Sequence, residues 1–173
     1  MSANEFPRLI DVRQTGMRTV RLVAESAERA ALARRFGIVA IERLEADLEL
    51  DRDGEAVNAT GTLVADIVQS CAVSAEDLAV AVREPIAFRF VPGVDSSAHQ
   101  ADHEVELAPD ELDEIEFTGT DIDLGEAVAQ SLALAIDPFA TGPDAEETRR
   151  RAGLLGTEDL SPFAALKGLK LGK

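Results

Sequence analysis

The sequence of 173 residues contains one cysteine, no tryptophan and no tyrosine, and each scarcity excludes a class of protein. A single cysteine rules out an intrachain disulfide and any zinc site built from several thiolates, and it is typical of a reducing compartment. Aromatic residues make up 4% of the chain, which leaves few rings on which exposed nucleic-acid bases could stack.

Long hydrophobic segments are also absent. No apolar run approaches the roughly 18 residues that span a bilayer. The opening residues, MSANEFPRLID, lack the basic start and the apolar stretch of about 7–15 residues that mark a signal peptide. We therefore expect a soluble, cytoplasmic protein that does not associate with membranes.

Negative charge is what the sequence has in excess, with a formal net charge of −16. Its distribution is uneven, because residues 1–43 carry a net +3, residues 44–147 a net −23 and residues 148–173 a net +4. An anionic body of this kind repels phosphate backbones and attracts basic partners. Solubility alone is an equally simple explanation of an acidic composition.

The first third of the chain shows signals for two short strands and a helix. We expect strands at residues 6–12 and 17–24, separated by a glycine. A helix near residues 27–36 is predicted from Ser26 as its N-cap and from Gly37, whose position suits a C-cap.

Strict alternation of apolar and polar residues predicts a long hairpin in the middle of the chain. Residues 45–50 alternate without a fault, and a second alternating run follows at residues 57–67 after the turn DRDG. Residues 78–91 alternate again and predict a further strand. Pro85 cannot donate a hydrogen bond to a neighbouring strand, so this strand should lie at an edge or be bulged there.

The stretch from residue 92 to residue 120 is strongly acidic, and short strands are expected in it at residues 104–107 and 113–117. A second helix is predicted to begin after Asp123 as N-cap and to stop at Asp137-Pro138. Leu124, Val128 and Leu132, at four-residue spacing, are expected to form its core-facing row.

The predicted architecture is α+β: a curved or barrel-like antiparallel sheet with two packed helices and a C-terminal extension. The core domain covers residues 1–139, a linker covers residues 140–160, and residues 161–173 form a short amphipathic helix. This terminal helix would dock either on its own domain or in a groove of a partner.

One segment resembles a calcium site, but a simpler interpretation is favoured. Glu49, Asp51, Asp53 and Gly54 match the first half of a calcium-binding loop. Thr60 stands where the bidentate glutamate belongs, so a hairpin turn is the preferred interpretation.

Two further groups of residues could form chemical sites. His99 and His103 are four residues apart and could face one metal, with Asp102 or Glu104 completing the site, but two exposed histidines are favoured. Cys71 has no basic residue near it in sequence to lower its pKa, which favours a packing role over nucleophilic chemistry. No nucleotide-binding or nucleophile motif is present, so we expect no enzyme activity, no catalytic residues, no cofactor and no metal.

Four stretches, taken together, resemble a known family. They are ESAERAALARRFGI, ATGTLVADIVQSCAVSAEDL, IDLGEAVAQSLALAIDPF and SPFAALKGLK, in this order along nearly the whole chain. Their order is similar to that of the YceD-like proteins, also called large ribosomal RNA subunit accumulation proteins.

The resemblance implies a role in ribosome biogenesis through accumulation of large-subunit ribosomal RNA, with no reaction and no catalytic residues to transfer. Many members have a second cysteine three residues after the first. Here Cys71 is followed by Ala72, Val73 and Ser74, so any zinc role of the family does not carry over.

Charge and resemblance together lead to the hypothesis that the chain acts through protein–protein contacts with a basic ribosomal protein or an RNA-processing factor. Acidic residues would steer the partner and the terminal helix would anchor it. The predicted partner-binding residues are Asp102, Glu104, Glu106, Asp110, Glu111, Asp113, Glu114, Glu116, Phe163, Leu166 and Leu169.

Two alternatives remain open. A direct RNA-binding protein would use the basic ends of the chain, and a hydrolase or nuclease, which is less favoured, would need clustered carboxylates. The basic residues available for RNA are Arg18, Arg21, Arg34, Arg35 and Arg149 to Arg151.

Overall fold

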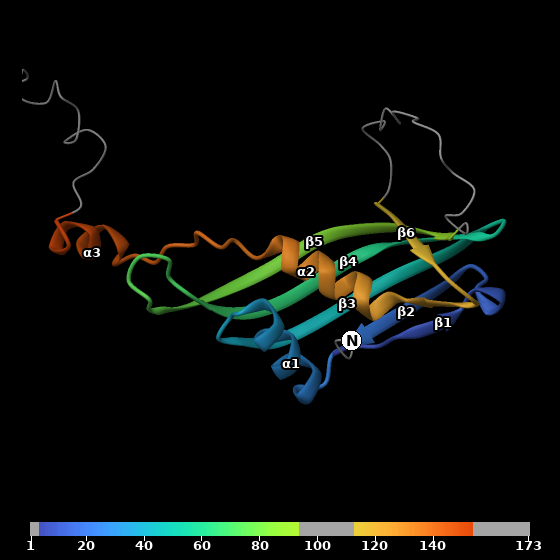
Figure 1. Cartoon of the computed structure of the whole chain (residues 1–173), viewed down its shortest axis with the longest axis horizontal. Coiled ribbons are helices and arrows are strands. Elements are labelled where there is room, and N and C mark those ends of the chain that lie inside the picture. The colour runs from blue at the N-terminus through green and yellow to red at the C-terminus, as the bar shows by residue number, and fades with distance from the viewer. Residues whose placement is uncertain (1–3, 94–112, 154–173) are drawn as a thin grey trace, which may run out of the picture. The chain divides into compact units, whose positions relative to one another are not determined.

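Three long strands form the centre of the fold in the computed structural model, which describes residues 4–93 and 113–153. Figure 1 shows these strands, β3, β4 and β5, side by side. In chain order the elements are β1 (Leu9–Asp11), a 3-10 helix (Val12–Gln14), β2 (Arg18–Val23), α1 (Ser26–Phe36), β3 (Ala40–Asp53), β4 (Ala56–Ser70), β5 (Asp77–Pro92), β6 (Asp113–Phe117), β7 (Asp121–Asp123), α2 (Leu124–Ala135) and α3 (Ala145–Arg151).

The described chain divides into two units. The larger unit contains residues 1–69 and 79–137, and the smaller contains residues 70–78 and 138–173. The predicted division into a core domain, a linker and a terminal helix stays a prediction. Within the predicted linker, α3 is helical, whereas residues 161–173 lie outside the described residues.

The predicted hairpin is confirmed and is longer than the alternation indicated. β3 and β4 pair antiparallel, from Ala40 opposite Val68 to Asp53 opposite Ala56. The segment that resembles a calcium loop is the hairpin turn, in which Gly54 takes a φ of +64°. This left-handed conformation is one that glycine adopts without a steric penalty.

One face of the sheet is buried by the two helices. Alternate residues of β4 and β5 lie in the core, as the alternation predicted, and Leu32 of α1 and Leu132 of α2 belong to the same hydrophobic cluster. Gly61 is required in β4 because a Cβ atom there would overlap the carbonyl oxygen of Asp47.

Both predicted helices are present, with one correction at a cap. α2 begins after Asp123, whose side chain accepts the backbone N–H groups of Gly125 and Glu126, as expected. The N-cap of α1 is Glu25, and Ser26 is the first helical residue. The Glu25 N–H donates to Glu28, so the reciprocal half of a capping box positions this helix start.

The predicted α+β class is confirmed, whereas the sheet, expected to be antiparallel and curved or barrel-like, differs from that expectation in two respects. The strand order β2-β3-β4-β5-β6 leaves the sheet open, because α1 and α2 cover its inner face and no closing pair is needed to bury it. β6 pairs with β5 in parallel, so the sheet is mixed. A parallel pair needs a crossover of about a dozen residues or more, and residues 93–112 supply that length.

The strand predicted at residues 113–117 is confirmed as β6, while the one at residues 104–107 lies outside the described residues. The register of β6 with β5 begins at Phe88. Within the described part of the chain, Pro85 therefore lies on an edge of β5, as predicted.

Candidate functional site

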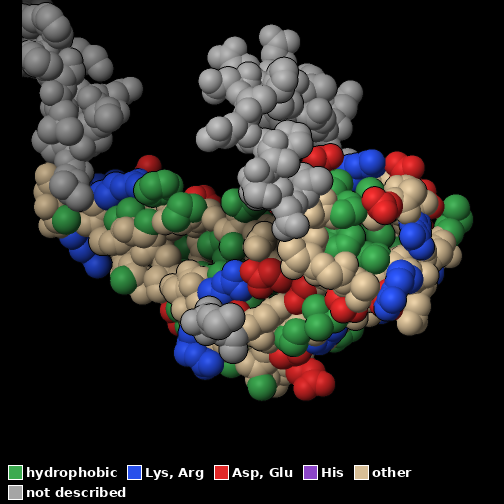
Figure 2. Space-filling view, turned by 45° about the vertical axis from the view of Figure 1, so that its right-hand side comes forward, with side chains coloured by type: hydrophobic (Ala, Val, Ile, Leu, Met, Phe, Trp, Pro, Cys, Tyr) green, Lys and Arg blue, Asp and Glu red, His purple; other side chains and the backbone are tan. Residues whose placement is uncertain are grey.

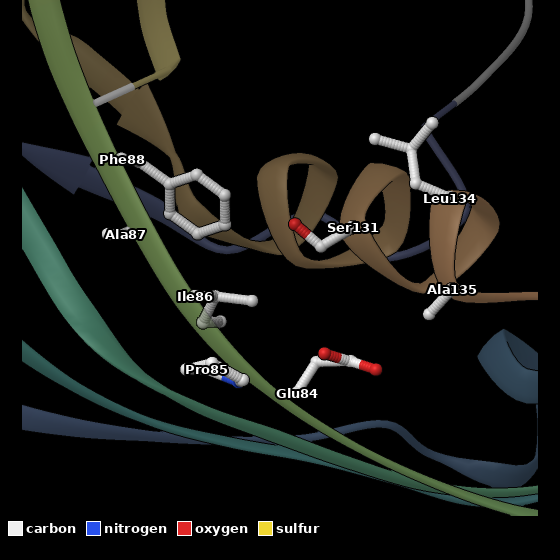
Figure 3. A pocket seen from close by; sticks show the side chains of 8 residues that line it. All are labelled: Glu84, Pro85, Ile86, Ala87, Phe88, Ser131, Leu134 and Ala135. Carbon is white, nitrogen blue, oxygen red and sulfur yellow. The ribbon is translucent and has the colours of Figure 1, made fainter. Parts of the chain in front are cut away.

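Three hollows follow one another between α2 and the strands β5 and β6. The first is bounded by the β5 edge and by α2 (Figure 3), and its lining residues are Glu84, Pro85, Ile86, Ala87, Phe88, Ser131, Leu134 and Ala135. The second shares Phe88, Ser131 and Leu134 with the first and adds Glu114, Ile115, Ala127 and Gln130. The third shares Ile115, Ala127 and Gln130 with the second and adds Phe90, Glu116, Phe117, Thr118, Asp121, Asp123 and Glu126. We call this continuous surface the α2 groove.

The floor of the α2 groove is apolar. Ile86, Phe88 and Phe90 point from β5 toward the core and are almost fully buried. Leu134 is different, because 85% of its surface is exposed at the rim. It lies outside the row of Leu124, Val128 and Leu132 that the sequence predicted and that packs into the core.

The charges of the α2 groove are all of one sign. No lysine or arginine lines it among the described residues, whereas six carboxylates do. They are Glu84, Glu114, Glu116, Asp121, Asp123 and Glu126. The groove therefore presents an apolar floor under an anionic rim.

These carboxylates differ in whether an arginine of the protein already pairs with them. Glu126 is held by Arg35 through two hydrogen bonds of 2.9 and 2.6 Å, and this contact lowers the pKa of Glu126. Glu114 lies 3.7 Å from Arg89 and is largely exposed. Within residues 4–93 and 113–153, Glu84 and Glu116 form no ion pair and remain available to a cationic ligand.

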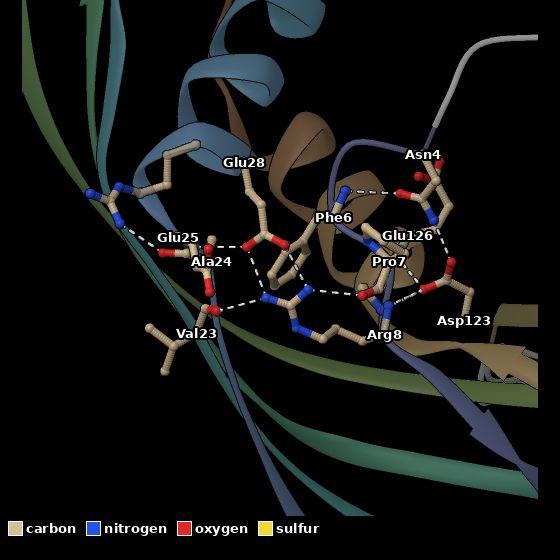
Figure 4. A network of polar contacts seen from close by, with 12 residues as sticks. Asn4, Phe6, Pro7, Arg8, Val23, Ala24, Glu25, Glu28, Asp123 and Glu126 are labelled. Atoms are coloured by element: carbon tan, nitrogen blue, oxygen red, sulfur yellow. Dashed lines mark hydrogen bonds and ion pairs between the residues drawn. The ribbon is translucent and has the colours of Figure 1, made fainter.

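A polar network on the N-terminal side of α2 fixes the start of that helix (Figure 4). Asp123 accepts the backbone N–H of Arg8 at 2.9 Å and also the side-chain amide of Asn4. The guanidinium of Arg8 in turn binds Glu28 at the start of α1. Through this network the N-terminal segment connects both helices.

The predicted partner-binding residues are only partly within the described chain. Glu114 and Glu116 are exposed on β6 and line the α2 groove, and Asp113 is the first residue of that strand. The remaining predicted residues lie outside the described residues, namely Asp102, Glu104, Glu106, Asp110, Glu111, Phe163, Leu166 and Leu169. His99 and His103 lie outside them too.

Sequence reasoning missed Glu84 and Leu134. Neither belongs to the acidic run or to the terminal segment, which contain all the predicted partner-binding residues. Leu134 could have been identified from the sequence, because it is a large apolar residue that does not belong to the predicted core-facing row of α2. Leu124, Val128 and Leu132, which form that row, are buried as predicted.

Cys71 belongs to the smaller unit and is buried, as expected of a packing thiol. Its sulfur nevertheless accepts backbone N–H groups from Gly142 at 3.3 Å, Ser74 at 3.3 Å and Val73 at 3.4 Å. The N–H of Gly142, then the side chain of Ser74, then the N–H groups of Ser74 and Val73 lower the pKa of Cys71 to about 6. Backbone N–H dipoles thus lower the pKa of Cys71, although no basic residue lies near it in the sequence.

Some of the basic residues predicted for RNA binding form ion pairs within the protein, and others do not. Arg35 is held by Glu5 and Glu126, and Arg21 by Glu45. Among the described residues Arg18 and Arg34 form no ion pair. Figure 2 shows basic and acidic side chains intermingled on the face that it presents, without a purely cationic patch.

The described residues contain neither a metal-binding cluster nor a membrane-spanning helix. No three His, Cys, Asp or Glu side chains are grouped so that they could hold a metal ion within residues 4–93 and 113–153. No helix in that part of the chain is long and apolar enough to cross a membrane.

Comparison with known proteins identified a family. The sequence model of a family described as Large ribosomal RNA subunit accumulation protein YceD matches residues 59–170, a range that includes the whole α2 groove. Neither a curated protein nor a solved structure matches the chain.

Proposed function

Because the chain belongs to the YceD family of large ribosomal RNA subunit accumulation proteins, we propose that it supports accumulation of that RNA by binding a basic protein. The partner is a basic ribosomal protein or an RNA-processing factor, and the chain itself catalyses no reaction. The family description names an effect on an RNA and no chemical transformation. The proposed role is therefore that of a factor in ribosome biogenesis.

The observation that carries this proposal is the charge of the middle of the chain. Residues 44–147 hold a net −23, and the hollowed surface in this range is lined by carboxylates without a lysine or arginine among the described residues. Binding to an RNA backbone draws its free energy mainly from cations that displace counterions. A cationic polypeptide suits this surface, whereas a polyanion does not.

The sequence supplies two parts of the proposed interaction. The acidic residues from Asp102 to Glu116 would raise the rate of association by steering a basic partner, an effect that salt screens. Phe163, Leu166 and Leu169 would provide apolar anchors that set the affinity. In this arrangement the chain shields a basic ribosomal protein or tethers an RNA-processing factor.

Direct RNA binding is the second candidate, and the guanidinium groups of Arg18 and Arg34, which form no ion pair with any described residue, favour it. Filter binding of large-subunit RNA to the full chain across a salt series tests it. Several phosphate contacts would give a steep loss of affinity with salt. Weak binding with a shallow salt dependence would leave the protein-binding function as the better account.

The proposed function is tested in cells from which the gene has been removed. We expect the ratio of large- to small-subunit ribosomal RNA to fall, and the wild-type gene to restore it. The full-length variant with Phe163→Ser and Leu166→Ser should restore it less well. An unchanged ratio in the deletion strain would contradict the proposed function.

The protein contact is tested separately with the immobilised full chain and proteins extracted from large ribosomal subunits. Retention of basic proteins should fall at every salt concentration in the Phe163→Ser, Leu166→Ser variant. Replacing Glu104, Glu106 and Glu111 by glutamine should instead flatten the salt dependence of retention. If neither variant changes retention, these residues do not form the contact.

A further inference from the structure

We propose that the α2 groove binds a basic, amphipathic segment of the protein partner. This inference rests on the proposed function, because it names the surface through which the chain would hold a cationic protein. It joins Glu114 and Glu116 of β6, which belong to the predicted acidic run, to the β5 edge and the outer side of α2, which do not.

The groove offers a place for apolar side chains. Leu134 is 85% exposed although it is a large aliphatic residue, and it lines the same two hollows as the buried ring of Phe88. A partner that covers Leu134 removes its apolar surface from water, which favours association. Figure 3 shows Ser131 on α2 directed toward Phe88 across the hollow, with Leu134 extending outward from the same helix.

The charges around that apolar surface specify the ligand. Glu84 marks one end of the groove, Glu114 lies beside its middle, and Glu116 lies at the other end. None of the three is buried, and among the described residues only Glu114 has a cation nearby, at 3.7 Å. In a segment that has lysine or arginine beside apolar residues, the cations would pair with the carboxylates of the rim and the apolar side chains would pack on the floor.

The β5 edge is unsuited to the addition of another strand. The N–H of Gly93 donates to Phe117 of β6, and backbone groups alternate in direction along a strand. Val91, Arg89, Ala87 and Pro85 therefore direct their backbone toward the same side. Since Pro85 has no N–H, the edge lacks a donor where an added strand would need one. Binding must use side chains instead, as when an amphipathic helix lies in a groove.

The probe for this inference is a fluorescein-labelled synthetic peptide of 18 leucine and lysine residues, with leucines at helical spacing. A scrambled peptide of identical composition keeps the charge and removes the apolar stripe. Fluorescence anisotropy with the full chain should show tighter binding of the amphipathic peptide. Equal binding of the two peptides would overturn the inference, because charge alone would explain it.

Two variants test the position of the site. Leu134→Ser should weaken binding about fivefold at all salt concentrations, since it removes an exposed anchor without opening the core. The triple variant Glu84→Gln, Glu114→Gln, Glu116→Gln should weaken binding about tenfold at low salt and less than about twofold at high salt.

Each variant has a matched control elsewhere on the surface. Met17→Ser removes an apolar side chain that is 89% exposed and does not line the groove. Glu42, Glu49 and Glu55 are exposed, and replacing all three by glutamine makes the same change in net charge. Both controls should bind the peptide as the wild type does. Groove variants that also bind like the wild type would overturn the inference.

The chain's own terminal segment is the competing occupant, because residues 161–173 contain apolar residues and three lysines but no acid. If Phe163→Ser with Leu166→Ser in the full chain tightens peptide binding, that segment fills the groove and the assignment to a partner is wrong. Unchanged or weaker binding supports a partner.

The outcomes separate this inference from the proposed function. If the peptide does not depend on the groove but deletion of the gene still lowers large-subunit RNA, the groove assignment fails and the function stands. If the peptide binds the groove while deletion leaves ribosomal RNA unchanged, the binding site stands and the function fails.

Discussion

Glu28 of α1 holds Arg8 with both of its carboxylate oxygens, at 2.7 and 2.8 Å from the two terminal guanidinium nitrogens (Figure 4). Arg8 also donates to the carbonyl of Val23 at 2.9 Å, and Glu28 accepts the backbone N–H of Glu25 at 2.7 Å. The Glu28 carboxylate thus caps α1 and also orients Arg8, whose hydrogen bond to Val23 connects the N-terminal segment to the end of β2. Its side chain is 19% exposed, so water screens the contact only in part.

Glu28→Gln should lower the free energy of unfolding by about 1–2 kcal/mol at neutral pH, because the amide keeps one acceptor but loses the charge. The hydrogen bond from Arg8 lowers the pKa of Glu28 below 4.5 in the folded chain. The stability that this ionised carboxylate adds is present above its unfolded pKa and is lost as the pH falls through the lowered value. Urea unfolding from pH 7 to pH 3 should therefore show the two proteins converging in acid.

Glu49→Gln is the control for that series, because Glu49 is exposed and has no ion pair among the described residues. Its unfolding curve should match the wild type throughout. A constant difference between Glu28→Gln and the wild type at every pH would show that the ionised form of Glu28 is not what stabilises the junction.

Gly125→Ala should destabilise the larger unit by at least about 2 kcal/mol, although alanine is a better helix former than glycine. The reason is space, because a Cβ atom at Gly125 would overlap the carbonyl oxygen of Phe6. Gly16→Ala is the matched change, since no atom lies within 4 Å of a Cβ there. Thermal unfolding should separate the two variants, and equal midpoints would contradict the close approach of Phe6 to α2.

Local patterns predicted the elements of this fold well, because their causes lie within a few residues. Alternation located the β3–β4 hairpin and β5, and Asp123 marked the start of α2. The parallel direction of β6 was not predictable in this way. It depends on how the chain crosses between β5 and β6, and no pattern within the five residues of β6 encodes that path.

The candidate site was predicted less well for the same reason. The α2 groove combines residues of β5, β6 and α2 that are up to about fifty positions apart, so no single run of sequence displays it. The environment of Cys71 is a second case. Its donor Gly142 is 71 residues away in sequence, and a search for nearby cations could not find a backbone N–H.

The thiol of Cys71 should titrate with a pKa of about 6, below that of an ordinary cysteine, because backbone N–H groups stabilise the thiolate. Thiolate absorbance near 240 nm, taken as the difference between the wild type and Cys71→Ser, measures this directly. The thiolate also adds to the free energy of unfolding. This contribution is complete above the pKa of Cys71 in the unfolded chain and is lost as the pH falls through about 6.

Ser74→Ala tests the source of that shift, because the side chain of Ser74 is the second largest cause after the N–H of Gly142. The midpoint in this variant should rise toward the ordinary thiol value. A wild-type midpoint near that of a free cysteine would show that the hydrogen bonds around the sulfur do not favour its charged form.

Arg35→Met should move stability and ligand binding in opposite directions. Arg35 holds Glu126 with two hydrogen bonds and also contacts Glu5, so its loss should cost about 0.5–1 kcal/mol of stability for a pair that is partly exposed. The same change frees Glu126, which lines the α2 groove. The amphipathic lysine–leucine peptide should then bind about two- to threefold more tightly, because one more carboxylate is available to its cations.

Arg34→Met separates this effect from net charge. Arg34 is exposed and has no ion pair within the described part of the chain, so its loss changes the total charge equally but frees no groove carboxylate. It should leave stability and peptide affinity near the wild-type values. If Arg34→Met tightens binding as much as Arg35→Met does, the peptide responds to the overall field of the protein. A gain confined to Arg35→Met locates the binding cations beside Glu126.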